Sequence, residues 1–487
     1  MKPSTLLLVV MVLLAACTSR QPRVVAPLSY APVPAAPAES FRDLPPRAAP
    51  LVVGNPLSLA KARLPSGMEI VLVERHTLPV FSARLLIARG ARDLGDRREE
   101  LLDLGMEALL REHASSPDAS PEIRPGADCD SDACVVSVSG TYGAFEAGLG
   151  ALADLAMRPR YVVTQLGQVR RSWESWVQGM GANSRRAVDI NARYLLFPKG
   201  DSYAPPAAAE RETIGRLRIE DLQTVHEQLF QPEHATLVVA GDVSFEELRA
   251  MAERKFGAWK QTRPALPLAA EAPPFPGPGV GTVLVADPSA LVHAYLVARA
   301  PEGRDPDIES LFLLSRLLGT LSGSLSDEVR AAMGATYHIT AEVIPGRLGS
   351  WWRIGGAFEP DKALPAMKAV LSSLREARDT GIDPEAFQAA RLSAIGELRS
   401  QTGTVSGVTK LVADTLSRGL PVVSAAGRAG RIARLTAPDI QKTARTWLAD
   451  NQLRLVVVGE KGDIDYDFND LGIGKVEWRT RRGEATR

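Results

Sequence analysis

The sequence has few of the side chains that bind transition metals. Its 487 residues include three cysteines and six histidines, and no two histidines lie four positions apart. Two imidazoles on one helix can share a zinc ion when this spacing puts them on the same face. The six histidines are His76, His113, His226, His234, His293 and His338. The chain therefore contains no paired-histidine zinc motif of the i, i+4 kind.

The chain also lacks an excess of one charge and a long apolar run. Lysine plus arginine and aspartate plus glutamate both number 57, so the formal charge is zero and no nucleic-acid partner is indicated. The apolar run at residues 6–14 is much shorter than the roughly 20 residues that a membrane-spanning helix needs. The arginine-rich residues 479–487 are expected to form a frayed terminus.

Residues 1–17 are typical of an export signal, with one lysine, the apolar run and then small residues. The LAAC sequence that ends at Cys17 resembles a bacterial lipoprotein cleavage box, so Cys17 is expected to carry lipid in the mature protein. Thr18 follows in place of aspartate, which by the same resemblance favours the outer membrane. We therefore predict a lipid-anchored protein at the periplasmic face of the outer membrane. An ordinary signal peptide with a cysteine at its cleavage site is the alternative.

Proline-rich segments divide the chain. Residues 18–55 are rich in proline and alanine and are predicted to form an extended tether. Residues 264–281 are a second proline-rich stretch, which we interpret as a linker. With 45% hydrophobic residues, the chain has enough apolar material for more than one core. We predict globular domains at residues 56–263 and 282–475, followed by a tail at 476–487.

The two globular regions repeat one plan. A strand, a turn and a strand at residues 71–90 are echoed at 283–300, and a strand ending in Gly-Asp or Gly-Glu occurs in both 234–248 and 452–465. Helical periodicity fills the sequence between these markers. The predicted helices are residues 97–113, 145–157, 164–177, 219–229, 306–318, 360–379 and 384–401. The predicted fold is α+β, with two duplicated domains that each contain an antiparallel sheet with helices on one face.

Two cysteines remain once Cys17 is assigned to lipidation. Cys129 and Cys134 lie five positions apart across the aspartate-rich turn DCDSDAC. In an oxidising compartment we expect them to form a disulfide that ties this turn to a strand at residues 135–139. Two free thiols are the alternative, because two cysteines alone cannot complete a structural zinc site.

The start of the first domain resembles the insulinase and pitrilysin metallopeptidases, the inverted zincins. LPSG at residues 64–67 and GARD at residues 90–93 match the strand and turn that open this family. The resemblance implies H-x-x-E-H on the next helix, where two histidines bind zinc and the glutamate activates water. That register falls on Asp103, Met106 and Glu107, and slips of one or six residues also fail to place two histidines. The resemblance therefore implies a homologue with a degenerate zinc site.

Three carboxylates are the remaining candidates for metal ligands. Asp103 and Glu107 lie at i and i+4, but zinc in this setting prefers nitrogen or sulfur, and Glu107 precedes Arg111 at an ion-pair spacing. The family's third ligand is a glutamate, for which Glu174 is the nearest candidate, and without the histidines it has little to coordinate. A carboxylate metal site is the less favoured alternative. We expect no cofactor on this chain, and zinc only in a partner.

Further family markers lie downstream. LFPKGDSYAPP at residues 196–206 resembles the family's FP-x-H-P-Y segment, and residues 212–243 resemble the segment that closes its first domain. LSGSLSDEVRAAMGATYHI at residues 321–339 resembles a second-half segment whose arginine and tyrosine contact the substrate. The resemblance therefore implies substrate binding by Arg330 and Tyr337. A guanidinium and a phenol can both donate hydrogen bonds to a peptide carbonyl.

The resemblance also implies an assembly. Chains of this size in the family form half of a clamshell chamber and close it in pairs, and in mitochondrial processing peptidase one chain supplies zinc while the other has lost it. We therefore predict a metal-free subunit that partners a zinc-bearing homologue in periplasmic peptide cleavage. A self-dimer is the other possible pairing. The competing hypotheses are a non-catalytic envelope lipoprotein that binds peptides at a sheet edge, and a hydrolase with a displaced metal.

Overall fold

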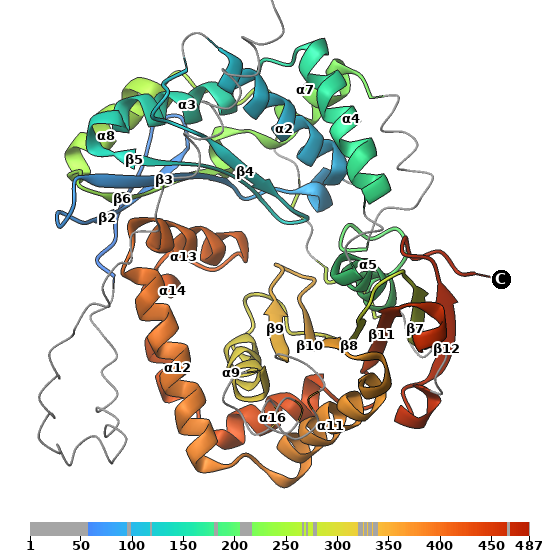
Figure 1. The fold of residues 1–487 in the computed structure, drawn as a ribbon. Coiled ribbons are helices and arrows are strands. Elements are labelled where there is room, and N and C mark those ends of the chain that lie inside the picture. Colours follow the sequence, from blue (N-terminus) through green and yellow to red (C-terminus); the bar gives the residue numbers. More distant parts are fainter. Residues whose placement is uncertain are drawn as a thin grey trace, which may run out of the picture. The chain divides into compact units, whose positions relative to one another are not determined.

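Two six-stranded sheets organise the protein (Figure 1). The computed structural model describes residues 57–94, 99–116, 119–179, 184–204, 217–264, 267–268, 271–275, 280–319, 325, 329, 334, 339–464 and 468–486. Cys17, Arg330 and Tyr337 lie outside the described residues. Among the helices that the structure describes, none is long and apolar enough to cross a membrane.

The first sheet has the strand order β1-β2-β6-β3-β5-β4. Its strands are β1 (Ala60–Arg63), β2 (Glu69–Glu74), β3 (Val80–Ile87), β4 (Gly126–Cys129), β5 (Cys134–Thr141) and β6 (Ala235–Gly241). The pair β2 and β6 is parallel, and the other neighbouring pairs are antiparallel. The outer strands of this sheet are therefore β1 and β4.

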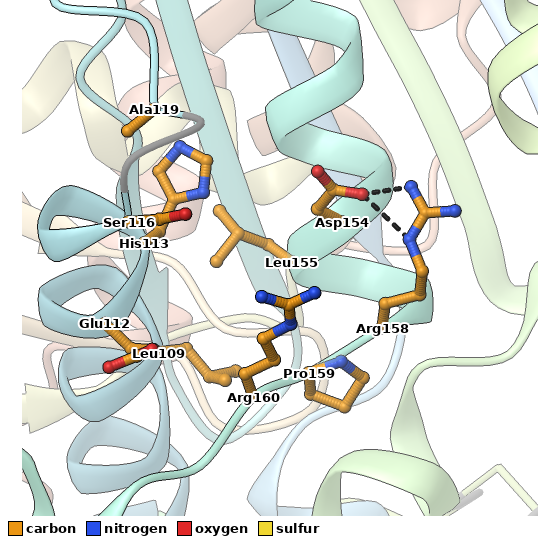
Figure 2. Close-up of a pocket in the computed structure, with 10 residues that line it drawn as sticks. All are labelled: Leu109, Glu112, His113, Ser116, Ala119, Asp154, Leu155, Arg158, Pro159 and Arg160. Atoms are coloured by element: carbon orange, nitrogen blue, oxygen red, sulfur yellow. Dashed lines mark hydrogen bonds and ion pairs between the residues drawn. The ribbon is translucent and has the colours of Figure 1, made fainter.

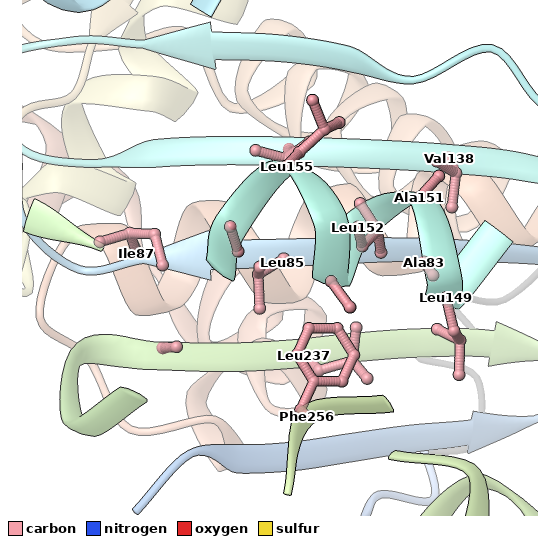
Figure 3. Close-up of a cluster of buried hydrophobic side chains, with 14 of the residues drawn as sticks. Ala83, Leu85, Ile87, Val138, Leu149, Ala151, Leu152, Leu155, Leu237 and Phe256 are labelled. Atoms are coloured by element: carbon pink, nitrogen blue, oxygen red, sulfur yellow. The ribbon is translucent and has the colours of Figure 1, made fainter. Parts of the chain in front are cut away.

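Helices cover one face of the first sheet and form its main core. The helices of this half are α2 (Glu99–Ser115), α3 (Phe145–Met157), α4 (Val163–Gly179), α5 (Ser184–Leu196), α7 (Ile219–Leu229) and α8 (Phe245–Phe256). Alternate residues of β3, such as Leu85 and Ile87, point into the core because strand side chains alternate between faces. Figure 3 shows side chains of α3, such as Leu152 and Leu155, in the same buried cluster as Leu85 and Leu237 of the sheet. The core thus joins α3 directly to β3, β5 and β6.

The second sheet has the order β12-β7-β11-β8-β10-β9. Its strands are β7 (Val280–Ala286), β8 (Val292–Arg299), β9 (Thr340–Ile344), β10 (Trp351–Phe358), β11 (Arg454–Gly459) and β12 (Lys475–Arg479). β7 is parallel to both β11 and β12, and the other pairs are antiparallel. β7 begins inside the predicted linker and β12 extends beyond the predicted boundary at residue 475, so the sheet includes residues that the sequence assigned to connecting or terminal segments.

The helices of the second half contact the second sheet, one another or, in one case, the first sheet. They are α9 (Asp307–Gly319), α11 (Ala363–Arg375), α12 (Pro384–Thr402), α13 (Val405–Ser417), α14 (Val423–Ala426), α15 (Arg428–Arg434), α16 (Ala437–Trp447) and α17 (Lys461–Ile464). The predicted α+β class with two helix-covered sheets is confirmed. The strand pairing differs in one respect: both sheets are mixed, because each contains parallel neighbours as well as antiparallel ones.

Each half contributes one helix that packs on the sheet of the other half. Helix α5 of the first half packs on the second sheet, where Val188 and Leu195 join a core with Val283 and Val456. Helix α13 of the second half packs on β3 and β6 of the first sheet, on the face that α3 does not cover (Figure 1). The hydroxyls of Ser82 on β3 and Thr409 on α13 are 2.9 Å apart in this buried contact. Each sheet is therefore covered on both faces only when both halves are folded.

Candidate functional site

Helix α2 carries the residues at the family's zinc register. Asp103 is exposed, Met106 is buried in the core of the first sheet, and Glu107 is half-buried. Arg111 donates from Nε and Nη2 to Oε1 of Glu107, at 2.9 and 2.7 Å. The i, i+4 ion pair expected from the sequence is thus formed. A guanidinium already bound to this glutamate opposes a divalent cation at the same oxygen, so these residues do not fit a zinc ion.

The register six residues further along α2 lies beside a small surface pocket of about 110 Å³ (Figure 2). Leu109, Glu112 and His113 line it from α2, and Arg158 and Arg160 line it from the segment that follows α3. Nε2 of His113 is buried and has no hydrogen-bond partner among the described residues. One imidazole beside two guanidinium groups is a poor site for a divalent cation, because the arginines repel it. This register does not fit zinc either.

The described residues contain no group of three or more histidine, cysteine, aspartate or glutamate side chains that could hold a metal ion. Glu174 lies in α4, and its side chain is outside the described part of the structure. Neither register of α2 therefore offers the nitrogen and oxygen donors that a catalytic zinc requires. No chemical step is assigned to a metal on this chain.

A second feature connects the two halves: a buried polar junction formed by Asp93, Asp132, Tyr203 and Arg347. Asp93 belongs to the GARD turn, Asp132 to the turn between β4 and β5, and Tyr203 to the LFPKGDSY segment. Arg347 lies in the loop between β9 and β10 of the second half. The polar junction thus joins four segments of the chain. Two of them resemble the family, the third is the cysteine-containing turn, and the fourth is a loop of the second half.

Arg347 lies at the centre of the polar junction. Its Nη2 donates to both carboxylate oxygens of Asp93, at 2.9 and 3.2 Å, and its backbone N–H donates to Oδ2 of Asp132 at 2.6 Å. The side chain of Arg347 is 7% exposed and that of Asp93 is 0% exposed. The backbone N–H of Gly90 supplies a further hydrogen bond to Asp93, at 3.1 Å. A buried charge pair is costly to break on one side, so this contact ties the first half to the second.

The hydroxyl of Tyr203 completes the polar junction. It donates to Oδ1 of Asp132 at 2.5 Å and accepts from the backbone N–H of Leu348 at 3.1 Å. Burial raises the pKa of the Asp132 carboxyl, while the hydrogen bonds from Tyr203 and Arg347 oppose this rise. Burial and the neighbouring carboxylate of Asp132 also raise the pKa of the Tyr203 hydroxyl, so the hydroxyl stays protonated and able to donate.

A disulfide holds the turn that carries Asp132. Cys129 and Cys134 are bonded and lie opposite each other on β4 and β5, with their Cα atoms 4.1 Å apart. Ser131, inside the same turn, donates from its hydroxyl to the carbonyl of Ser202 at 2.8 Å. The disulfide therefore restricts a turn that contacts both the LFPKGDSY segment and the second half.

The structure brings together only some of the residues that the sequence singled out. Asp93 and Tyr203 are part of the family-like segments, but the sequence does not predict the contact of Asp93 with Arg347 or that of Tyr203 with Asp132. Arg347 and Asp132 are 215 positions apart, and a charged residue in a loop carries no signal of such a distant partner. The predicted substrate residues Arg330 and Tyr337 lie outside the described residues, and their role stays a prediction.

Comparison with known proteins identifies the fold as that of the M16 peptidases. A peptidase M16 inactive domain from Pseudomonas fluorescens is 19% identical, with a TM-score of 0.74 over 83% of this chain and 99% of that chain. An M16-like peptidase from Alicyclobacillus acidocaldarius is 16% identical, with a TM-score of 0.71 over 83% of this chain and 98% of the other. A chain in complex III2 from Candida albicans is 13% identical, with a TM-score of 0.72 over 86% of this chain and 100% of the other.

The sequence itself matches one family model. Residues 216–393 match the family described as the peptidase M16 inactive domain. No curated protein shows significant sequence similarity to the chain. The chain therefore has the fold of the M16 peptidases, the insulinase and pitrilysin family, and its residues 216–393 match that family's inactive-domain model. The resemblance inferred from the sequence motifs is confirmed.

Proposed function

We propose that this protein is a non-catalytic M16 subunit that pairs with a zinc-bearing homologue to cleave peptides in the periplasm. The observation that carries the proposal is the ion pair of Glu107 and Arg111 on α2, at the position where a catalytic member would hold zinc. A chain that lacks the metal donors but keeps the fold can still supply the opposite wall of a chamber. Complex III2, which contains a chain of the same fold, supports an assembly role because it is a multisubunit complex.

In this proposal Arg330 and Tyr337 contact the backbone carbonyls of the peptide that the partner cleaves. The test mixes the purified protein with a homologue that contains H-x-x-E-H and follows cleavage of a quenched fluorescent peptide. We expect the mixture to be more active than the homologue alone, and Arg330→Ala to remove most of this gain. Arg254→Ala on the exposed surface of α8 is the matched control and should leave the gain intact. Equal activity with and without this chain would refute the proposal.

A second function, peptide binding without cleavage, is favoured by the outer strand β4. Within the described residues, β4 pairs only with β5, so its other edge has backbone groups that an extended peptide could pair with. Saturable binding of an unstructured peptide by the lone chain, with no gain for the homologue, would favour this function. Stoichiometric zinc in the purified protein, measured by plasma mass spectrometry, would instead support the displaced-metal hydrolase.

We also propose that Cys17 anchors the protein to the outer membrane through lipid, as the LAAC sequence predicts. Cys17→Ser should move the protein from the membrane fraction to the soluble periplasmic fraction and abolish labelling by a clickable fatty acid. Retention of the variant in the outer membrane would contradict lipid anchoring at this residue.

A further inference from the structure

A pocket of about 310 Å³ lies among helices α12, α13, α14 and α15. It shares no lining residue with the pocket beside α2 or with the polar junction. Its size lies at the lower end of the usual range for small-molecule sites, about 300–1,000 Å³. None of the comparisons assigns a ligand to this place.

The interior of the pocket is apolar. Ile395, Leu398, Arg399 and Thr402 line it at positions i, i+3, i+4 and i+7 of α12, so they share one face of the helix. Ile395 and Leu398 are buried, and Leu411 from α13 is buried as well. The remaining described lining residues are mostly small or apolar: Leu57, Ala425, Ala426, Gly427, Ala429 and Gly430. An alkyl chain can therefore contact apolar side chains from several helices.

The charge of the pocket is of one sign. Three arginines line it, Arg399, Arg428 and Arg434, and no aspartate or glutamate is among the described lining residues. Arg428 is compensated, because its Nε donates to the two oxygens of Glu309 at 3.1 and 3.0 Å. Arg399 and Arg434 are exposed, and within the described chain their guanidinium groups have no hydrogen-bond or ion-pair partner. Two uncompensated cations thus lie at the border of an apolar space.

We propose that this pocket binds a long-chain monocarboxylate, with its alkyl chain along α12 and its carboxylate between Arg399 and Arg434. A guanidinium is permanently charged and presents N–H groups in a fork that matches a carboxylate. A neutral hydrocarbon would leave these arginines unused, and a small hydrophilic anion would leave the apolar walls exposed to water. Apolar walls next to two arginines therefore favour a ligand that has both an alkyl chain and a carboxylate.

The test is calorimetric titration of the full chain with laurate, in comparison with dodecanol and butyrate. We expect saturable binding of one laurate, with affinity rising about fourfold for each added methylene that is buried. Dodecanol should bind at least about tenfold more weakly, because it lacks the charge that the arginines bind. Butyrate should show no saturable binding. Higher salt should weaken laurate but not dodecanol.

Two variants locate the site. Arg399→Gln combined with Arg434→Gln should weaken laurate about tenfold or more without unfolding the protein, because both side chains are exposed. Ala429→Phe should fill the pocket and block both laurate and dodecanol, while Arg254→Gln on α8 serves as the matched control. The proposal is overturned by an absence of saturable laurate binding, or by laurate binding that neither variant changes. A leucine-terminated tripeptide that displaces laurate at lower concentration would also overturn it, in favour of a peptide C-terminus.

Discussion

Replacement of Arg347 by methionine tests the polar junction most directly. Methionine keeps much of the length and apolar contact of the arginine side chain but removes its charge and its side-chain hydrogen bonds. The carboxylate of Asp93, whose side chain is 0% exposed, would then keep the backbone N–H of Gly90 but lose its guanidinium partner. The variant therefore removes the cation that is hydrogen-bonded to a buried carboxylate.

The size of the effect follows from this burial. Removal of one partner of a buried ion pair typically costs about 3–5 kcal/mol, because the remaining charge has been taken out of water. An exposed pair contributes about 1 kcal/mol or less. We therefore expect Arg347→Met to lower the free energy of the first unfolding transition by about 3–5 kcal/mol. A second change, Asp93→Asn, should be less costly in the Arg347→Met variant than in the native chain, because the guanidinium that the carboxylate compensates is already gone.

The assay is urea denaturation followed by tryptophan fluorescence and circular dichroism. The matched control is Lys410→Met, which breaks the exposed pair of Lys410 and Asp414, with side chains 64% and 51% exposed. We expect the control to change stability by less than about 1 kcal/mol. A loss of no more than about 1 kcal/mol in Arg347→Met would show that the junction does not join the halves and would refute the reasoning.

Three further predictions concern single groups. Burial lowers the pKa of His226 to about 4 from 6.5, and its Nε2 donates to the carbonyl of Ala156. Because the unfolded chain binds the proton more readily, stability should fall by about 3 kcal/mol between pH 6.5 and 4, and His226→Gln should remove this part of the slope in acid denaturation curves. Reduction of the disulfide of Cys129 and Cys134 opens a short loop and should cost about 2 kcal/mol, measured by unfolding with and without a phosphine reductant; an unchanged midpoint would contradict it. Tyr203→Phe leaves a buried carboxylate oxygen and a backbone N–H without their hydroxyl partner and should cost about 1–3 kcal/mol by the same assay, whereas a neutral effect would mean that water replaces it.

The local elements that the sequence predicted well have strong apolar periodicity. Helices at residues 145–157 and 219–229 coincide with α3 and α7, since their buried positions recur at helical spacing and contact a nearby sheet. Helices α5 and α13 were not predicted. Their buried residues, such as Val188 and Val408, contact strands of the other half, and such a distant partner leaves no trace in local spacing.

The same limit applies to the candidate site. The absence of histidines at the zinc register and the ion pair of Glu107 with Arg111 could be predicted, because both depend on residues within one helix. The polar junction could not be predicted, because Asp93, Asp132 and Arg347 meet only after both halves have folded. Strand direction was also missed: the parallel pairing of β2 with β6 depends on the long connection between them and not on the composition of either strand.

The exchange of α5 and α13 has a consequence for biosynthesis. While the ribosome is still translating the second half, the nascent first half has an uncovered apolar sheet face, and that face is closed only after Ser417 has emerged. Each half expressed alone should therefore aggregate or recruit chaperones, and coexpression of the two fragments should rescue both. Evolution of such a chain by loss of one half is correspondingly restricted, because each half completes the interior of the other.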